Sequence, residues 1–216
     1  LMAVFQFVDS IGEIFTPVSD TFTRTESNGW GTSDSGHAWA TSGGSAADYS
    51  VGSGTGSVSL AAVNTRHFTF TGAFTDVDML AEVTVPVTAL GADISAALVA
   101  RYGDDNNFYM TQLLHDTSGN IDLQIVRRVA GTFTTLATSL NQLAYTPGTA
   151  TKVRFQVVGS MLRVRIWTGA TEPTVWHLAT TDTSFTAAGA VGTHSNLLTS
   201  NTNSLPVPVA SAYDTL

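Results

Sequence analysis

Hydrophobic and polar residues alternate over residues 152–167, K-V-R-F-Q-V-V-G-S-M-L-R-V-R-I-W. Two alternating runs around a Gly-Ser pair are typical of a β-hairpin with a two-residue turn. With Gly159 and Ser160 as the turn, the register of the two strands is fixed. The opposed pairs are then Val158 and Met161, Gln156 and Arg163, Arg154 and Arg165, and Lys152 and Trp167.

The cations of this hairpin all fall on one face, and the other face is apolar throughout. Because directly opposed like charges destabilise a strand pair, this face requires an acidic neighbouring strand or an anionic or polyhydroxyl ligand. Aromatic rings and planar polar groups are also the side chains that bind sugars. The candidate carbohydrate-binding residues are Lys152, Arg154, Arg163, Arg165 and Trp167.

Residues 75–85 are predicted to form a strand with one apolar and one acidic face. Asp76, Asp78 and Glu82 share the acidic face. If this strand lies beside the hairpin, its carboxylates neutralise the arginines. The alternative is a pair of catalytic carboxylates in a glycosidase, but D-V-D-M-L-A-E departs from the E-x-D-x-x-E motif of laminarinase-like enzymes. We therefore expect no catalytic residues.

From Asp20 onward, short extended segments alternate with clusters of Gly, Asn, Asp and Ser, which is typical of an all-β sandwich or jelly roll. The prolines of Leu205–Val209 indicate an edge strand or an extended connection, because proline lacks a donor for a central strand. Further strands are predicted over 39–40, 49–51, 56–61, 66–71, 94–102, 107–115, 121–129, 132–139, 151–158 and 161–168, with two or three more up to residue 212.

The N-terminal segment has apolar residues at three- and four-residue spacing up to Pro17, which predicts a short amphipathic helix. It lacks the basic start of a signal peptide and is too short and interrupted to span a membrane. We expect residues 1–19 to be a docking or oligomerisation segment, with packing on its own domain as the alternative. The jelly-roll domain would then occupy residues 20–216.

Composition excludes several classes of function. A net charge of −8 argues against a nucleic-acid partner, and the absence of cysteine excludes disulfides and thiolate metal sites. The five histidines are scattered without the spacing of a zinc site, and no nucleophile elbow or phosphate-binding glycine motif occurs. No cofactor is required by any motif.

Several short stretches, in their order along residues 20–216, resemble one family. They are D-T-F-T-R from Asp20, G-W-G from Gly29, the Trp39 region, N-F-Y from Asn107, V-R-R-V-A-G from Val126, K-V-R-F-Q-V, R-I-W, Glu172-Pro173 with Trp176, and Tyr213-Asp214. Together they resemble the concanavalin A-like jelly-roll modules of actinobacterial secreted proteins and of minor tail or fibre proteins of actinobacterial phages.

The resemblance implies a two-sheet antiparallel sandwich whose first and last strands pair. It brings Asp20 close to Asp214, where some members hold a structural calcium ion with oxygen ligands. It favours a non-enzymatic virion structural protein that contacts other virion proteins, forms homo-oligomers through residues 1–18 and binds cell-surface polysaccharide. The alternatives are a carbohydrate-binding module of a secreted, extracellular bacterial protein, or a glycoside hydrolase. Fold alone does not choose between them.

Overall fold

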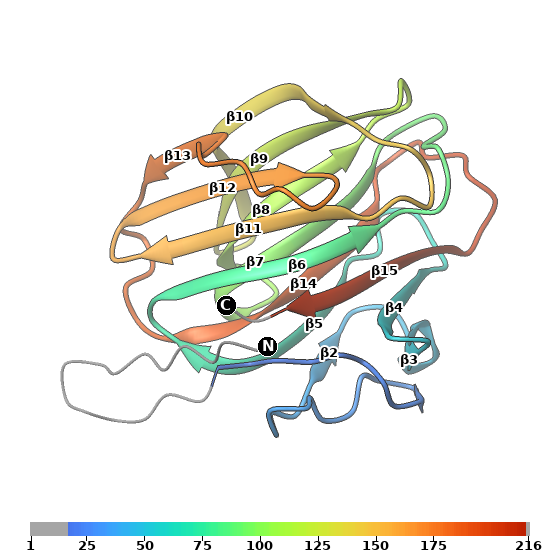
Figure 1. The fold of residues 1–216 in the computed structure, drawn as a ribbon, viewed down its shortest axis with the longest axis horizontal. Helices are drawn as coiled ribbons and strands as arrows, with labels where there is room; N and C mark the ends of the chain where they lie inside the picture. Colours follow the sequence, from blue (N-terminus) through green and yellow to red (C-terminus); the bar gives the residue numbers. More distant parts are fainter. Residues whose placement is uncertain (1–16, 215–216) are drawn as a thin grey trace.

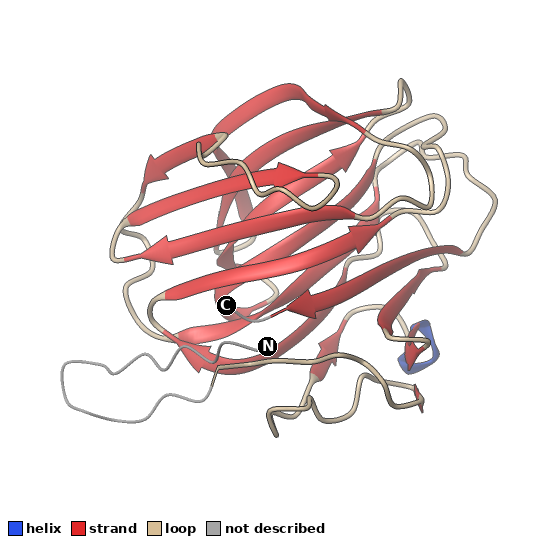
Figure 2. Cartoon of the chain, viewed as in Figure 1, coloured by secondary structure: helices blue, strands red, loops and turns tan. Residues whose placement is uncertain are grey.

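The computed structural model describes residues 17–214, which form two packed antiparallel β-sheets (Figure 1). Strands dominate, and the single helical element described is the short 3₁₀ helix η1, Ala46–Asp48 (Figure 2). The strands are β1 (Glu26–Ser27), β2 (Ala40–Ser42), β3 (Tyr49–Gly52), β4 (Thr55–Leu60), β5 (His67–Phe74), β6 (Val77–Thr84), β7 (Ile94–Asp104), β8 (Asn107–His115), β9 (Asn120–Val129), β10 (Thr132–Ala144), β11 (Thr151–Val158), β12 (Met161–Trp167), β13 (Leu178–Thr181), β14 (Gly189–Leu197) and β15 (Val207–Asp214).

One sheet has eight strands in the order β1-β3-β4-β15-β6-β11-β12-β13, and the other has seven in the order β10-β9-β8-β7-β14-β5-β2. Neighbouring strands are far apart in sequence at several places, as in a jelly roll. The predicted two-sheet antiparallel jelly-roll sandwich is confirmed. The last strand, β15, pairs with β4 and β6, whereas β1 pairs with β3.

The hairpin of β11 and β12 has the register that its alternation predicts. Val158 pairs with Met161, Arg154 with Arg165, and the two strands are joined at Gly159, whose φ of 56° suits a residue without a Cβ. The apolar face of the hairpin is fully buried between the sheets. Its buried side chains are Val153, Phe155, Val157, Leu162, Val164 and Ile166.

The main core fills the space between the two sheets, because alternate residues of each strand point inward. From β6 it receives Met79, Ala81 and Val83, as the pattern of residues 75–85 predicts. Trp30 and Trp39 close one end, with ring centroids 5.3 Å apart in an edge-on arrangement. These two tryptophans are therefore core residues, and their rings are not exposed for stacking on a sugar.

The prediction that Leu205–Val209 forms an edge or a connection is wrong for its second half. β15 begins at Val207 and lies between β4 and β6 inside the eight-stranded sheet. Proline is tolerated because Pro208 pairs with Ser59 of β4, whereas pairing with β6 starts only at Ala210. The strand therefore has a neighbour on one side only at Pro208, and the missing N–H lies at a local edge.

The predicted N-terminal helix and docking segment lie almost wholly outside the described residues, which begin at Pro17. The oligomerisation role of residues 1–18 stays a prediction. Within residues 17–214, no helix has the length and apolar character needed to cross a bilayer.

Candidate functional site

The acidic strand β6 lies directly beside β11, and this neighbour decides the chemistry of the hairpin's polar face. Arg154 binds Asp78 at two points, with Nε 2.8 Å from Oδ1 and Nη2 2.7 Å from Oδ2. The hydrogen bonds that Arg154 donates to Asp78 raise the pKa of its guanidinium and so hold its charge. Lys152 lies 3.5 Å from Glu82. Two of the predicted binding cations therefore have carboxylate partners within their own sheet.

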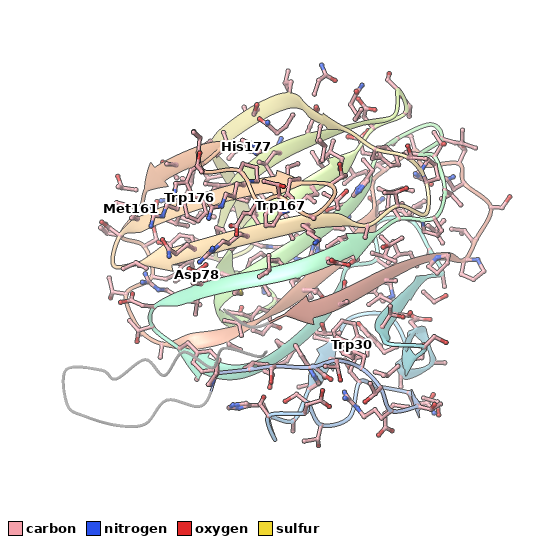
Figure 3. The ribbon with its side chains drawn as sticks, viewed as in Figure 1. Trp30, Asp78, Met161, Trp167, Trp176 and His177 are labelled. Carbon is pink, nitrogen blue, oxygen red and sulfur yellow. The ribbon has the colours of Figure 1, made fainter. Side chains whose placement is uncertain are left out.

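The loop between β12 and β13 supplies a third carboxylate and an aromatic ring to the same face. Glu172 accepts hydrogen bonds from Arg154 and forms an ion pair with Arg165. The ring of Trp176 stacks over Arg165 and Arg163, with the guanidinium carbons 4.4 and 4.5 Å from its centroid. Figure 3 shows the side chains of Asp78, Trp167 and Trp176 on the eight-stranded sheet and its β12–β13 loop.

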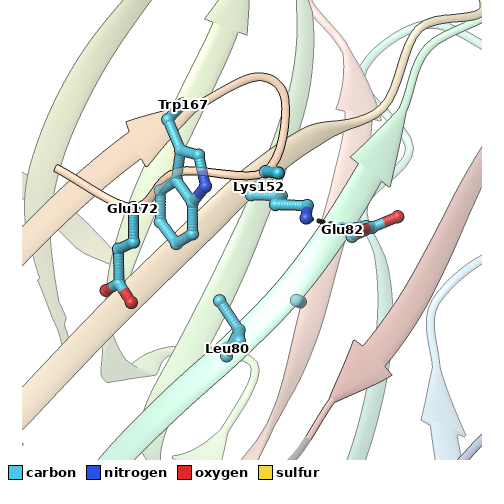
Figure 4. A pocket seen from close by; sticks show the side chains of 7 residues that line it. Leu80, Glu82, Lys152, Trp167 and Glu172 are labelled. Carbon is cyan, nitrogen blue, oxygen red and sulfur yellow. Dashed lines mark ion pairs between the residues drawn. The ribbon is translucent and has the colours of Figure 1, made fainter.

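A small hollow remains between this loop and β6, with a volume of about 180 Å³ (Figure 4). Lys152 and Trp167 are the two predicted binding residues that line it, together with Glu82 and Glu172. Trp167 is 6% exposed, so its ring offers little surface for stacking on a sugar, and its Nε1 has no hydrogen-bond partner among the described residues.

All five residues predicted to bind carbohydrate thus lie together on one face, as the alternation requires. The guanidinium of Arg163 donates to Gln156 and stacks on Trp176, while Arg154, Arg165 and Lys152 pair with acids. This arrangement accounts for the cations without an external ligand. The carbohydrate-binding role of these residues stays a prediction.

The calcium ligands implied by the family resemblance have other partners where the structure describes them. Asp20 is 1% exposed and accepts hydrogen bonds from both terminal nitrogens of Arg24 and from the indole of Trp39. The Asp214 side chain lies outside the described residues. Across residues 17–214 no group of three or more His, Cys, Asp or Glu is arranged to hold a metal ion. The Asp20 carboxylate fits a structural ion pair better than a cation site.

The outer face of the seven-stranded sheet carries a second hydrophobic cluster that the sequence patterns did not reveal. Its residues alternate along their strands with main-core residues such as Leu98 and Tyr109, so they point away from the sandwich interior. The cluster consists of Phe68, Ala97, Val99, Tyr102, Phe108, Met110 and Val126, with Phe70 and Ala190 packed against it.

These outward residues are buried because the tip of the β7–β8 hairpin folds over them. The pairing register shifts after Ala100, and Arg101 has a φ of 47°, which bends the hairpin at this point. The ring of Tyr102 then stacks on Phe70 with centroids 4.5 Å apart. Asp105 at the tip accepts a hydrogen bond from Ser42 of β2, at 2.6 Å. The tip is thereby fixed to the far edge of the sheet.

Next to this cluster, one row of paired residues crosses four strands of the sheet, and three of its four side chains are polar. His194 pairs with Ala97, Ala97 with Gln112, and Gln112 with Gln124, in β14, β7, β8 and β9. A hollow of about 250 Å³ lies here, lined by Arg66, Met110, Gln112, Leu114, Gln124, Val126, Phe133, Thr135, His194, Asn196 and Leu198.

The polar groups of this hollow are incompletely satisfied. His194 is 2% exposed, and both of its ring nitrogens lack a hydrogen-bond partner among the described residues, as does Oδ1 of Asn196. Burial lowers the pKa of His194 to about 3, so the imidazole is neutral at pH 7 and offers one donor and one acceptor. Its ring packs on Phe68 at 4.6 Å. Buried polar groups without partners cost free energy and call for a physical explanation.

Sequence reasoning missed this hollow because its residues come from distant strands and form no motif. In the sequence, His194 is one of five scattered histidines, and neither glutamine belongs to a motif that would indicate a binding site. The alternation of β8 and β14 could have placed Gln112 and His194 on outward faces, but their adjacency depends on the strand order of the folded sheet.

Comparison with known proteins supports the fold and leaves the family open. No protein-family model matches the chain, and no curated protein matches it in sequence. Among solved structures, the chain is similar to a Bacillus licheniformis β-glucanase, with a TM-score of 0.63, 10% identity, and coverage of 91% of this chain and 97% of the other.

Two further structures show the same likeness. The Bacteroides ovatus mixed-linkage glucan PUL GH16 in complex with its G4G4G3G product has a TM-score of 0.61 and 11% identity, covering 90% of this chain and 97% of the other. The carbohydrate binding module CBM66 from Bacillus subtilis has a TM-score of 0.57 and 12% identity, covering 81% and 91%. At these identities the likeness defines a class of fold, the concanavalin A-like jelly roll shared by carbohydrate-binding modules and glycoside hydrolases.

Proposed function

We propose that this chain is a non-catalytic carbohydrate-binding domain whose site is the hollow on the outer face of the seven-stranded sheet. The observation that carries the proposal is the buried imidazole of His194, which has no hydrogen-bond partner within residues 17–214 and lines the hollow next to Gln112 and Gln124. Sugar hydroxyls both donate and accept, so they match amides and a neutral imidazole. The similar structures described above support this reading, since their names include a carbohydrate binding module and a β-glucanase.

The residues that line the hollow argue against hydrolysis of the bound sugar. Glycosidases use a pair of carboxylates beside the scissile bond, and none of the lining residues is Asp or Glu. The acids on the opposite sheet are held by cations, with Asp78 on Arg154 and Glu82 near Lys152. We therefore favour binding over catalysis.

We place the site on this sheet and not on the hairpin face, because Lys152, Arg154 and Arg165 have carboxylate partners and Arg163 donates to Gln156. A hollow of about 250 Å³ lies just below the range of about 300–1,000 Å³ found for drug-sized ligands. It suits one sugar ring of a longer chain. An extracellular location and a role on a virion surface are both compatible with such binding, and both stay predictions.

The test is a glycan array followed by titration calorimetry with the oligosaccharides that bind. Gln124→Ala and His194→Leu should each weaken binding about fivefold to tenfold, the effect of one hydrogen bond. The melting temperature should not fall, because the Gln124 side chain forms no hydrogen bond within the described part of the chain and leucine suits the buried position of His194. Loss of binding in Arg154→Ala or Arg165→Ala, with Gln124→Ala unaffected, would move the site to the hairpin face.

Catalysis is tested separately by incubating the protein with the polysaccharides it binds and measuring new reducing ends. No product is expected. Product that persists after removal of Gln124 and His194 would show an active centre elsewhere, and product that disappears with them would make this hollow catalytic.

A further inference from the structure

Three of the chain's nine cationic side chains form no ion pair within residues 17–214. Arg163 is one of these, and it bonds to Gln156 and stacks on Trp176. The other two, Arg66 and Arg128, both lie on the outer face of the seven-stranded sheet. The paired cations are Arg24, Arg101, Arg127, Lys152, Arg154 and Arg165.

Arg128 is a buried guanidinium without a compensating carboxylate. It is 8% exposed, and its Nε and Nη1 have no hydrogen-bond partner among the described residues. Its guanidinium carbon lies 4.4 Å from the centroid of the Phe133 ring, which stacks on it. An unpaired buried charge is costly, and a stacking contact offsets only part of that cost. In a protein of net charge −8 this arrangement is unexpected for a purely structural residue.

Arg66 lines the hollow itself. Its Nη1 donates to the backbone carbonyl of Asp105 at 3.0 Å, at the tip of the β7–β8 hairpin. The Asp105 carboxylate does not pair with it, since that group accepts from Tyr102 and Ser42. The neighbouring Asp104 accepts from Asn107 and from a backbone N–H. The acids at the tip are thus engaged by neutral donors, and the charge of Arg66 is uncompensated by an ion pair.

Arg66 contacts the tip of the β7–β8 hairpin, and Arg128 lies near Gly131 in the turn between β9 and β10. Arg66 contacts Asp105, and a Cβ at Gly131 would lie 3.7 Å from Nη2 of Arg128 and 3.4 Å from Oδ1 of Asn106. Phe133, which covers Arg128, also lines the hollow. The hollow is therefore lined by one guanidinium without an ion-pair partner within residues 17–214, that of Arg66, and by no carboxylate, while Arg128 lies behind Phe133.

We infer that the saccharide bound in this hollow is acidic, with a carboxylate or sulfate group held by Arg66. The inference rests on the proposed function and adds the class of sugar. A guanidinium binds such an anion by two parallel hydrogen bonds, and Arg128 contributes a second, fixed positive charge beneath Phe133. A neutral sugar would leave both charges uncompensated.

The experiment is titration calorimetry of the full chain with oligosaccharides of matched length, one neutral, one containing uronic acid and one sulfated. The acidic ligands should bind at least about tenfold more tightly than the neutral one, as expected for a charge-assisted hydrogen bond. The comparison of uronic and sulfated ligands identifies the anion. Raising NaCl from about 0.1 M to about 1 M should remove most of this preference, because the screening length falls from about 10 Å to about 3 Å.

Three variants assign the effect to residues. Arg66→Gln should abolish the preference for acidic ligands, so that acidic and neutral oligosaccharides of matched length bind with equal affinity. Arg128→Met should reduce the preference and leave the melting temperature equal or higher, since it removes an unpaired buried charge. Arg163→Gln is the matched control, an unpaired arginine on the opposite sheet, and should change neither measurement.

The results separate this inference from the proposed function. Equal binding of neutral and acidic ligands, with no effect of Arg66→Gln, overturns the acidic class and leaves carbohydrate binding intact. Binding of no oligosaccharide of any class overturns the proposed function together with this inference. A clear fall in melting temperature for Arg128→Met would show that Arg128 is structural, and would leave the preference to be judged on Arg66 alone.

Discussion

Arg154 and Asp78 form a two-point ion pair across the adjacent strands β11 and β6, with Nε–Oδ1 and Nη2–Oδ2 distances of 2.8 and 2.7 Å. Both side chains are about one-fifth exposed, at 21% and 20%. Gln156 also donates to Asp78, at 2.9 Å. Asp78 therefore organises the polar face that, in sequence, looks like a cluster of unpaired cations.

Removing Asp78 should destabilise the protein more than removing any other acid on this face. We expect Asp78→Ala to lower the free energy of unfolding by about 2–3 kcal/mol, because Arg154 and Gln156 lose their partner in a half-buried setting. Urea denaturation measures this. Glu82→Gln is the control, since its pair with Lys152 is longer and more exposed, and it should cost less than about 1 kcal/mol.

A double-mutant cycle tests the pair directly. If Asp78→Ala and Arg154→Ala together cost as much as their separate effects added, the two residues do not interact energetically. We expect a coupling of at least about 1 kcal/mol.

The hairpin face should contribute to stability and leave ligand binding unaffected. Arg165→Ala and Lys152→Ala should keep the affinity for any saccharide that the wild type binds, while Arg165→Ala lowers the melting temperature through the loss of its contacts with Glu172 and Trp176. Parallel calorimetry and thermal unfolding measure both effects. Reduced affinity without reduced stability would support the sequence-based prediction of a binding site on this face.

Stability should fall as the pH drops below about 6.5, because two histidines are buried in the neutral form. Burial lowers the pKa of His115 to about 4 and that of His194 to about 3. Between about pH 6 and pH 4.5 the unfolded chain binds these protons and the folded protein does not. The free energy of unfolding should therefore decrease by up to about 2–3 kcal/mol per pH unit, or about 1.4 kcal/mol for each histidine.

His194→Leu provides the control for this pH dependence. It should remove about half of the slope, leaving the contribution of His115, in urea titrations at several pH values. An unchanged slope would mean that His194 is protonated to the same extent in the folded and unfolded protein.

Proline should be tolerated at one point of β15 and excluded two residues later. Ala210 pairs with Ser57 on one side and Thr84 on the other, whereas Pro208 has a partner only in β4. Ala210→Pro should cost about 3 kcal/mol or more, because a backbone donor inside the sheet is lost. Pro208→Ala should change the free energy of unfolding by less than about 1 kcal/mol. Similar effects at both positions would contradict this account.

Local hydrophobic and polar patterns alone were sufficient to predict most strands and the pairing register of the β11–β12 hairpin. The predicted ranges 107–115 and 151–158 coincide with β8 and β11, because alternation and flanking turn residues define a strand within a short window. Proline in Leu205–Val209 misled the prediction for β15, since a proline's tolerance depends on whether a second strand lies beside it. That neighbour comes from β6, more than a hundred residues earlier.

The candidate site could not be predicted from the sequence, because it also depends on which strands are neighbours in the folded sheet. Gln112, Gln124 and His194 come together only through the order of β8, β9, β7 and β14 in the folded sheet. The bend at Arg101 that folds the hairpin tip over this face has no signal in the local sequence. Nothing in the chain's motifs therefore distinguishes His194 from the other histidines.

The sequence by itself determined the all-β class, the strand periods, the polar faces of β6 and of the β11–β12 hairpin, and the pairing within that hairpin. These follow from the two-residue repeat of a strand and from a short turn. Tertiary structure alone decided that Asp78 lies beside Arg154 and that Arg66 and Arg128 lie on a face without a carboxylate partner. Lateral strand order is set by long-range pairing, so it determines which charges meet within the sheet and which do not.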